Sequence, residues 1–346
     1  MLITEQQKRA ALFVGAAGMG LMMAARAWRR RDPYEFSGKS VVITGGSRGL
    51  GLVMARELAD EGARVTLIAR DEQELARAAD DILSRQPFAD VLTVVADVRR
   101  RFDTERATAQ VLERFSRIDV LINNAGIIQV GPAAHMNVAD YEDAMNTHFW
   151  GPLYMTLAAV PHMRRQGEGR IVNISSIGGR VAVPHLLPYS ASKFALSGLS
   201  DGLRTELADD NIVVTTVCPG LMRTGSPVNA LFKGKRPKEY AWFAISDSLP
   251  LASIDARRAA RQIINACRFG DAELVITVQA KIAILARNLA PELFADTLTT
   301  LNRLLPRATG TDGDRAAPGR ESESAWAPSA LTETTYRAAE DNNELE

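Results

Sequence analysis

The sequence has 346 residues, of which 41 are basic and 41 acidic, so its formal net charge is zero. A chain without excess positive charge offers little to nucleic-acid phosphates, and we expect no nucleic-acid partner. With 46% hydrophobic and 24% charged residues, the composition is that of a globular protein, not of a disordered or fibrous one.

The neutral total hides opposite charges at the two ends of the chain. Residues 1–31 hold six basic residues and one acidic residue, a net charge of +5. Residues 307–346 hold four arginines and nine carboxylates, a net charge of −5. The two cysteines, Cys218 and Cys267, are far apart and fit neither a disulfide framework nor a zinc site, so we expect a reducing compartment and no metal.

Residues 10–25 form an uncharged apolar stretch. As a helix it would be about 24 Å long, slightly less than the ~30 Å hydrocarbon core of a bilayer. Flanking basic side chains can reach the headgroups, and the arginines after the stretch favour the cytoplasm. We therefore expect residues 1–36 to be a membrane anchor with a basic collar, and the remainder to lie in the cytoplasm. A helix docked on a soluble cytoplasmic protein and a cleaved signal peptide remain alternatives.

The middle of the chain alternates short apolar runs with longer amphipathic ones. Because strands that are apolar throughout and separated by helices indicate a parallel sheet covered on both faces, residues 37–280 are expected to form one doubly wound α/β domain of the Rossmann type. The expected strands are 40–44, 64–69, 91–96, 119–123, 170–175 and 211–218, and residues 273–277 could form a seventh. The first expected helix begins at about residue 50, and the others lie near 72–85, 103–116, 140–165 and 188–208.

Two further segments follow this domain. Residues 281–306 are expected to form two amphipathic helices, either packed on the domain or lying against a membrane. Residues 307–346 are acidic and polar without sustained apolar periodicity, which predicts a disordered tail that carries no chemistry.

A glycine-rich turn connects the first expected strand to a helix. It reads Thr-Gly-Gly-Ser-Arg-Gly-Leu-Gly over residues 44–51. Glycines at such a turn let the backbone approach a pyrophosphate, and the helix N-terminus offers free N–H groups. The same residues fit the Gly-x-Ser-x-Gly elbow of hydrolases, but that interpretation leaves the later motifs unexplained.

The second expected strand ends at Ala69-Arg70, without the carboxylate that would hold the ribose of NAD. Arg48 lies in the glycine-rich turn. Two guanidinium groups at this place suit a 2′-phosphate, which they can bind in a bidentate manner, so we expect NADP(H) as the cofactor. The alternative is that both are solvated surface arginines.

Tyr189 and Lys193 lie four residues apart in an expected helix and so share one face. A free tyrosine has a pKa near 10, and a nearby ammonium group lowers this value by favouring the phenolate. Ser176, at the carboxyl end of the preceding strand, is placed to hydrogen-bond a substrate oxygen. A Tyr-x-x-x-Lys pair alone is weak evidence, because it occurs by chance on many helices.

Together, these motifs resemble the short-chain dehydrogenase/reductase family, of the classical type, over residues 37–280. The resemblance implies a single domain that transfers hydride between NADP(H) and a carbonyl or alcohol. The motifs that carry it are TGGSRGLG at 44–51, Asp97, NNAG at 123–126, Ser176, YSASK at 189–193 and PGLMRT at 219–224.

The resemblance also implies roles for individual residues. Tyr189 would be the general acid/base, Ser176 would polarise the carbonyl, and Lys193 would lower the pKa of Tyr189 and hold the nicotinamide ribose. The expected cofactor-binding residues are Gly45, Ser47, Arg48, Gly49, Leu50, Gly51, Arg70, Asp97, Val98, Asn124, Ala125, Gly126, Tyr189, Lys193, Pro219, Gly220 and Thr224.

One position departs from the family pattern. The family has an asparagine three residues before a glycine that corresponds to Gly151, where it completes a proton relay to the lysine, and this chain has His148 there. Asn146 would point to another side of the helix. Because an imidazole can carry a proton near neutrality, we hypothesise that His148 is a catalytic residue that takes over the relay, with a packing role as the alternative.

Residues 225–251 are expected to form a lid over the substrate. Aromatic residues in this segment, together with apolar residues after Ser176, suggest a pocket for a small lipophilic carbonyl or alcohol, with ordinary packing as the alternative. The sequence leaves the oligomeric state open, a homo-oligomer included. A second function remains open as well, namely a non-catalytic NADP(H)-binding sensor or scaffold at the membrane.

Overall fold

The computed structural model describes residues 32–249, 253–310 and 313–345, together with Gly18, Gly20, Met23 and Ala24. The expected anchor over residues 10–25 and its basic collar therefore lie almost entirely outside the described residues. Among the helices in the described ranges, none is both long and apolar enough to cross a membrane.

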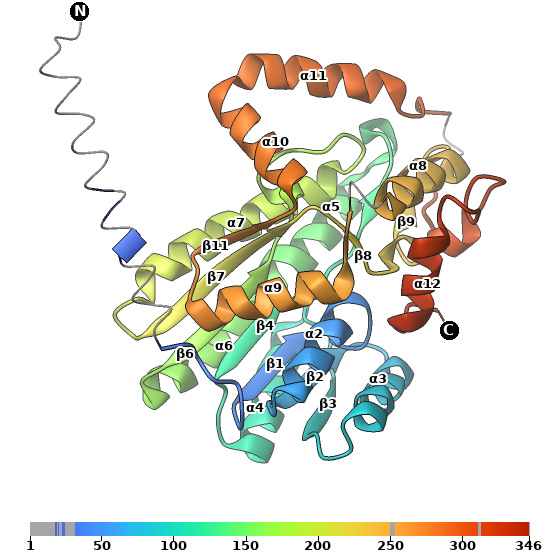
Figure 1. Ribbon diagram of the computed structural model, residues 1–346. Helices are drawn as coiled ribbons and strands as arrows, with labels where there is room; N and C mark the ends of the chain where they lie inside the picture. The colour runs from blue at the N-terminus through green and yellow to red at the C-terminus, as the bar shows by residue number, and fades with distance from the viewer. Residues whose placement is uncertain are drawn as a thin grey trace, which may run out of the picture.

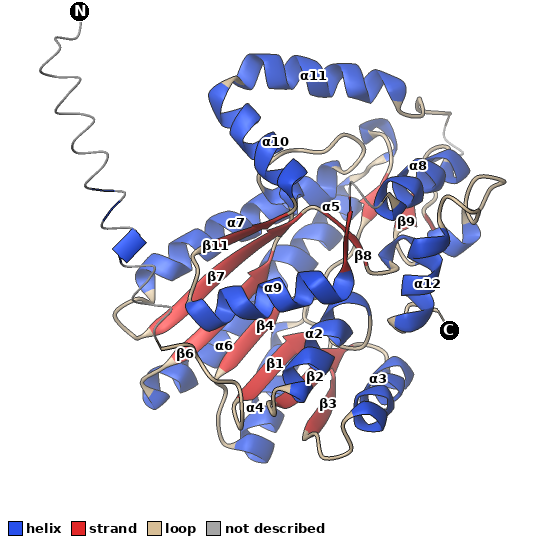
Figure 2. Ribbon diagram, in the orientation of Figure 1, coloured by secondary structure: helices blue, strands red, loops and turns tan. Residues whose placement is uncertain are grey.

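A parallel sheet of seven strands forms the centre of the protein (Figure 2), in the order β11-β7-β6-β4-β1-β2-β3. All seven expected strands are confirmed to within two residues. The strand order reverses between β1 and β4, and ligands of such sheets bind at this switch point. The strands are β1 (Ser40–Thr44), β2 (Arg64–Ala69), β3 (Val91–Val95), β4 (Val120–Asn123), β6 (Gly169–Ile174), β7 (Ile212–Pro219) and β11 (Glu273–Ile276).

Helices cover both faces of the sheet, as the predicted doubly wound fold requires. One apolar core lies between the sheet and helices α2 (Gly49–Asp60), α3 (Glu72–Arg85) and α9 (Ala256–Phe269). The other lies between the opposite face and helices α4 (Arg101–Phe115), α6 (Gly151–Gln166) and α7 (Leu187–Glu206). Strands buried on both sides explain why their sequences are apolar throughout and not alternating.

The expected lid over residues 225–251 contains β9 (Leu231–Phe232) and α8 (Arg236–Ser248). Its aromatic side chains pack on one another, with the Phe232 and Tyr240 ring centroids 5.3 Å apart. They form a third apolar core together with Val130 and Phe243. The rings of this lid core therefore support the lid and do not line the main cavity.

The segment after the sheet forms the two expected helices, α10 (Val278–Leu289) and α11 (Pro291–Leu304). They extend away from the body of the domain (Figure 1), and α11 buries none of its side chains. Their exposed residues include Ile282, Leu289 and Leu293, which leaves this part of the protein with an apolar surface.

The C-terminal region departs from the predicted disordered tail. Within residues 313–345, β12 (Ala317–Pro318) pairs with β9, and α12 (Glu333–Asp341) lies beside α8 (Figure 1). The composition is acidic, but isolated small and aromatic side chains dock on the lid. Ala327 and Ala339 are fully buried, and the hydroxyl groups of Tyr336 and Tyr240 lie 2.5 Å apart.

Candidate active site

The glycine-rich turn between β1 and α2 lies against the end of β4. Gly45 has a φ of +63°, and a Cβ atom there would lie 2.8 Å from the Cα atom of Ala125. The Asn124 amide donates to the carbonyl oxygens of Thr44 and Gly45, at 3.0 and 3.1 Å. Arg48 precedes α2 and makes no side-chain cap, and the first residues of this helix, Gly49 and Leu50, line the cavity.

A cavity of about 600 Å³ opens above this turn, at the carboxyl ends of the strands. With one exception, every predicted catalytic and cofactor-binding residue lines it. The exception is Gly51, where a Cβ atom would lie 2.0 Å from the carbonyl oxygen of Gly45. Gly51 therefore allows close packing of α2 against the turn and does not itself contact the cavity.

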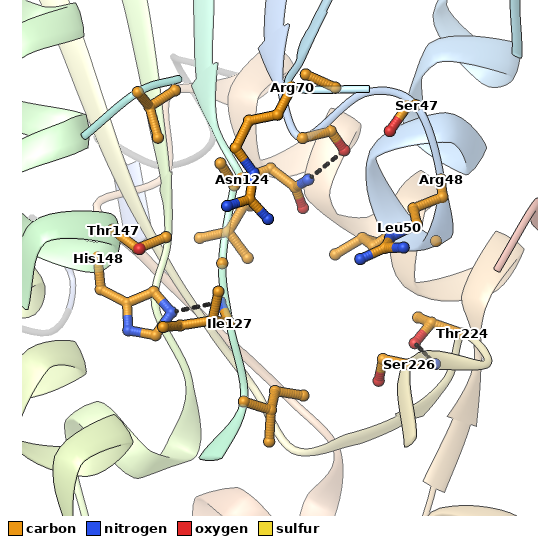
Figure 3. A pocket seen from close by; sticks show the side chains of 18 of the residues that line it. Ser47, Arg48, Leu50, Arg70, Asn124, Ile127, Thr147, His148, Thr224 and Ser226 are labelled. Carbon is orange, nitrogen blue, oxygen red and sulfur yellow. Dashed lines mark hydrogen bonds between the residues drawn. The ribbon is translucent and has the colours of Figure 1, made fainter. Parts of the chain in front are cut away.

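Charged side chains surround one end of the cavity, and Figure 3 shows the Arg48 and Arg70 guanidinium groups directed into it. Arg48 forms an ion pair with Glu74 at 3.0 Å. At the next strand end, the Asp97 carboxylate accepts hydrogen bonds from Arg99. Burial alone would raise the pKa of Asp97, but the hydrogen bonds from Arg99 outweigh it and lower the pKa.

Ser176, Tyr189 and Lys193 lie together at the other end of the cavity. The Lys193 ammonium donates to the carbonyl oxygen of Ile174 at 2.8 Å and lies 5.7 Å from the Tyr189 ring centroid. Ser176 caps a short turn by accepting from the Gly178 N–H. The structure thus brings Ser176, at the end of β6, next to Tyr189 and Lys193 on α7.

Burial controls the protonation of this trio. It raises the pKa of the Tyr189 phenol, an effect that a hydrogen bond with Ser176 only partly offsets. It also lowers the pKa of Lys193 to about 7. Lys193 is not among the causes of the Tyr189 shift, and the lowering of the Tyr189 pKa by Lys193 stays a prediction.

The family profile described as short chain dehydrogenase matches residues 39–231. This chain belongs to the short-chain dehydrogenase/reductase family. Membership makes it an oxidoreductase that uses a nicotinamide cofactor, as the resemblance implied.

Curated relatives and solved structures agree with this assignment. A "Dehydrogenase/reductase SDR family protein 7-like" from Anopheles gambiae is 32% identical over 82% of this chain and 90% of its own. The "11-beta-hydroxysteroid dehydrogenase A" of Sesamum indicum is 40% identical over 55% of this chain and 54% of its own. The structure of L-sorbose reductase from Gluconobacter frateurii, complexed with NADPH and L-sorbose, is 26% identical with a TM-score of 0.63, over 70% of this chain and 97% of that one.

His148 lies in a π-helical turn (Asn146–Trp150) between α5 (Val138–Met145) and α6. Its Nε2 atom accepts from the Ile127 N–H at 3.1 Å (Figure 3), and Nδ1 lies 2.7 Å from the Ser192 hydroxyl oxygen. Burial, followed by the charge of Lys193, lowers the pKa of His148 well below its usual value. These contacts describe a neutral imidazole with both nitrogens engaged, unlike the proton carrier that the relay hypothesis requires.

The sequence did not identify several residues that line the cavity. Most of them adjoin predicted site residues at strand ends, and the rule that ligands bind at those ends is a signal for them. Glu344 gave no such signal, because it belongs to the predicted disordered tail. These residues are Ile68, Ala69, Asp71, Glu74, Ala96, Arg99, Ile127, Ile128, Thr147, Ile174, Ser175, Met222, Ser226 and Glu344.

The neutral state of His148 predicts a pH dependence of stability. Folding lowers its pKa, so the unfolded chain binds the proton first. The stabilising contribution is therefore complete above the unfolded pKa of about 6.5 and declines as the pH falls below it. From pH 7.5 to 5.5, we expect the wild type to lose up to about 1.4 kcal/mol more unfolding free energy than His148→Asn, measured by urea denaturation.

The other three histidines are present in both proteins of this comparison and cancel. Equal losses of stability in the two proteins would show that His148 titrates normally in the fold. The proton-relay role stays a prediction, and full turnover of His148→Ala at every pH would contradict it.

Proposed function

We propose that this protein is an NADP(H)-dependent reductase or dehydrogenase that interconverts a lipophilic carbonyl and its alcohol. The observation that carries the proposal is the arrangement of one cavity. Ser176, Tyr189 and Lys193 lie at one end of it, and the N-terminus of α2 with two arginines lies at the other.

The residues present fit a nicotinamide dinucleotide. Glycine at position 45 lets the turn pack directly on Ala125, and the turn and the start of α2 line the cavity, where the N–H groups of a helix N-terminus suit a pyrophosphate. Asp97 and Arg99 form one wall of the cavity near the expected adenine position. When bound, the cofactor donates or accepts a hydride at its nicotinamide ring.

We assign the proton chemistry to the trio. Tyr189 supplies the proton to the substrate oxygen during reduction, because burial keeps its phenol protonated. Ser176 donates a hydrogen bond to the same oxygen. Lys193 holds the cofactor ribose, and its pKa of about 7 allows it to return a proton to the site near neutral pH. His148 lies beside the trio, with its ring centroid 5.3 Å from that of Tyr189, and its proton-relay role stays a prediction.

Two observations support a lipophilic substrate. Tyr189 packs against the edge of the lid core, so the reacting centre adjoins an apolar region. Ile127, Ile128 and Met222 add apolar lining to the cavity. Several relatives are named as hydroxysteroid dehydrogenases or as similar to them, and we extend this to the present chain as a class of steroid-like or comparably apolar compounds.

We also propose that residues 10–25 tether the protein to a membrane, with its catalytic domain in the cytoplasm. The support is the apolar stretch itself and the arginines that follow it.

Replacing Arg48 and Arg70 by alanine tests the choice of cofactor. Loss of hydrogen bonds to a charged 2′-phosphate should raise KM for NADPH by roughly 10- to 100-fold and leave KM for NADH nearly unchanged. Arg85→Ala, an exposed arginine at the end of α3, is the matched control and should alter neither value. Equal effects on both cofactors would refute NADP(H) specificity.

Tyr189→Phe tests the mechanism in an assay of NADPH oxidation over a panel of polar and lipophilic ketones. Removing the proton donor should lower kcat by about 100-fold or more on the preferred substrate. The control is Tyr154→Phe, which loses the same hydroxyl outside the cavity and should keep full activity. Activity that survives Tyr189→Phe would contradict the mechanism, and tight NADPH binding without any turnover would support the sensor or scaffold function.

Cell fractionation tests the tether. The full chain should remain in membranes after a carbonate wash, whereas a chain that starts at residue 32 should be soluble with unchanged kcat. A full chain that carbonate releases would argue against the anchor, and retention of both proteins would place the membrane contact elsewhere.

A further inference from the structure

The end of the chain enters the cofactor cavity. Beyond α12, residues 342–345 pass over the glycine-rich turn, and Glu344 is one of the residues that line the cavity. The segment is held from outside as well. Arg56 donates to the Asn342 side chain at 3.1 Å, and Arg77 donates to the Asn343 side chain at 2.9 Å.

The backbone of this segment accepts a hydrogen bond from a backbone N–H group of the turn, a group that could otherwise bind a ligand. The Gly49 N–H donates to the carbonyl oxygen of Asn342 at 2.9 Å. The Asn343 amide donates to the carbonyl oxygen of Ser47 at 2.8 Å. Because Gly49 is the first residue of α2, its N–H is among the groups that a helix N-terminus presents to a phosphate.

The Glu344 carboxylate occupies the adjoining cationic position. Its Oε2 atom lies 3.4 Å from Arg48 Nε and accepts a hydrogen bond from the Asn229 amide at 2.7 Å. The residue is only 6% exposed, and a Cβ atom on Gly49 would lie 2.5 Å from its Oε1 atom. Such a buried carboxylate depends on its cation, and Arg48 is the guanidinium expected to bind the 2′-phosphate.

A cofactor phosphate cannot bind the Arg48 guanidinium while the Glu344 carboxylate lies against it, nor accept from the Gly49 N–H while the Asn342 carbonyl oxygen does so. We propose that residues 342–345 are an intramolecular competitor of the cofactor, which fills the phosphate-binding position until the dinucleotide displaces it. The inference rests on the proposed function, since it assumes that NADP(H) binds at Arg48 and the glycine-rich turn. α12 remains docked on the lid through Tyr336 and Ala339, so that only the last few residues need to move.

The test measures the equilibrium dissociation constant for NADPH, by its fluorescence, on four full-length or nearly full-length proteins. They are the wild type, a chain that stops after Asp341, Glu344→Gln and Glu340→Gln. The shortened chain keeps all of α12, and the point variant covers the case in which shortening disturbs the lid. Glu340 is exposed on α12 outside the cavity, so Glu340→Gln removes the same charge without touching Arg48.

Without the competitor, every molecule is open to the cofactor, so the shortened chain should bind NADPH about 5- to 50-fold more tightly. Glu344→Gln should give part of this gain, Glu340→Gln none, and kcat should be the same in all four proteins. Equal binding of NADPH by the wild type and the shortened chain would overturn the competitor proposal but not the proposed function. So would weaker binding after shortening, which would make the segment part of the cofactor site. Failure of all four proteins to bind NADPH or NADH would overturn the proposed function and the competitor together.

Discussion

The active site depends on the contact between the ends of β1 and β4, which the hydroxyl group of Thr44 stabilises. The Thr44 side chain accepts hydrogen bonds from the backbone N–H groups of Asn124 and Ala125, at 3.0 and 3.1 Å. The two strands are neighbours at the point where the sheet order reverses. Because this hydroxyl joins the end of β1 to the end of β4 at the switch point, the glycine-rich turn and the Asn124–Gly126 segment form one continuous floor under the cavity.

Burial gives the opposite end of the cavity its chemical character. Ionised side chains lose hydration when they are enclosed, so a buried phenol and a buried ammonium both shift towards their neutral forms. Tyr189 and Lys193 show these two shifts side by side. Near pH 7 the Tyr189 phenol therefore keeps its proton, whereas Lys193, with a pKa of about 7, can either hold or release one.

The sequence predicted the sheet well, because strands buried on both faces need apolar residues at every position, as Val41, Val42 and Ile43 show. It also predicted many residues that line the cavity, since those residues follow strand ends. It could not predict the partners of His148, because the contact with Ile127 arises only once β4 lies beside α6. The prediction of a disordered tail was wrong for another reason. Its average composition conceals single residues, such as Ala327 and Tyr336, each of which fits one position on the lid.

The C-terminal segment connects two parts of the protein, the lid and the glycine-rich turn. α12 has nine residues, and it contacts the lid at Tyr240 while the segment after it contacts Arg48. A displacement of α8 that carries α12 with it would also withdraw Glu344 from the cofactor cavity. One C-terminal segment thus contacts both the lid, through Tyr336, and the glycine-rich turn, where the Glu344 carboxyl group lies 3.4 Å from Arg48.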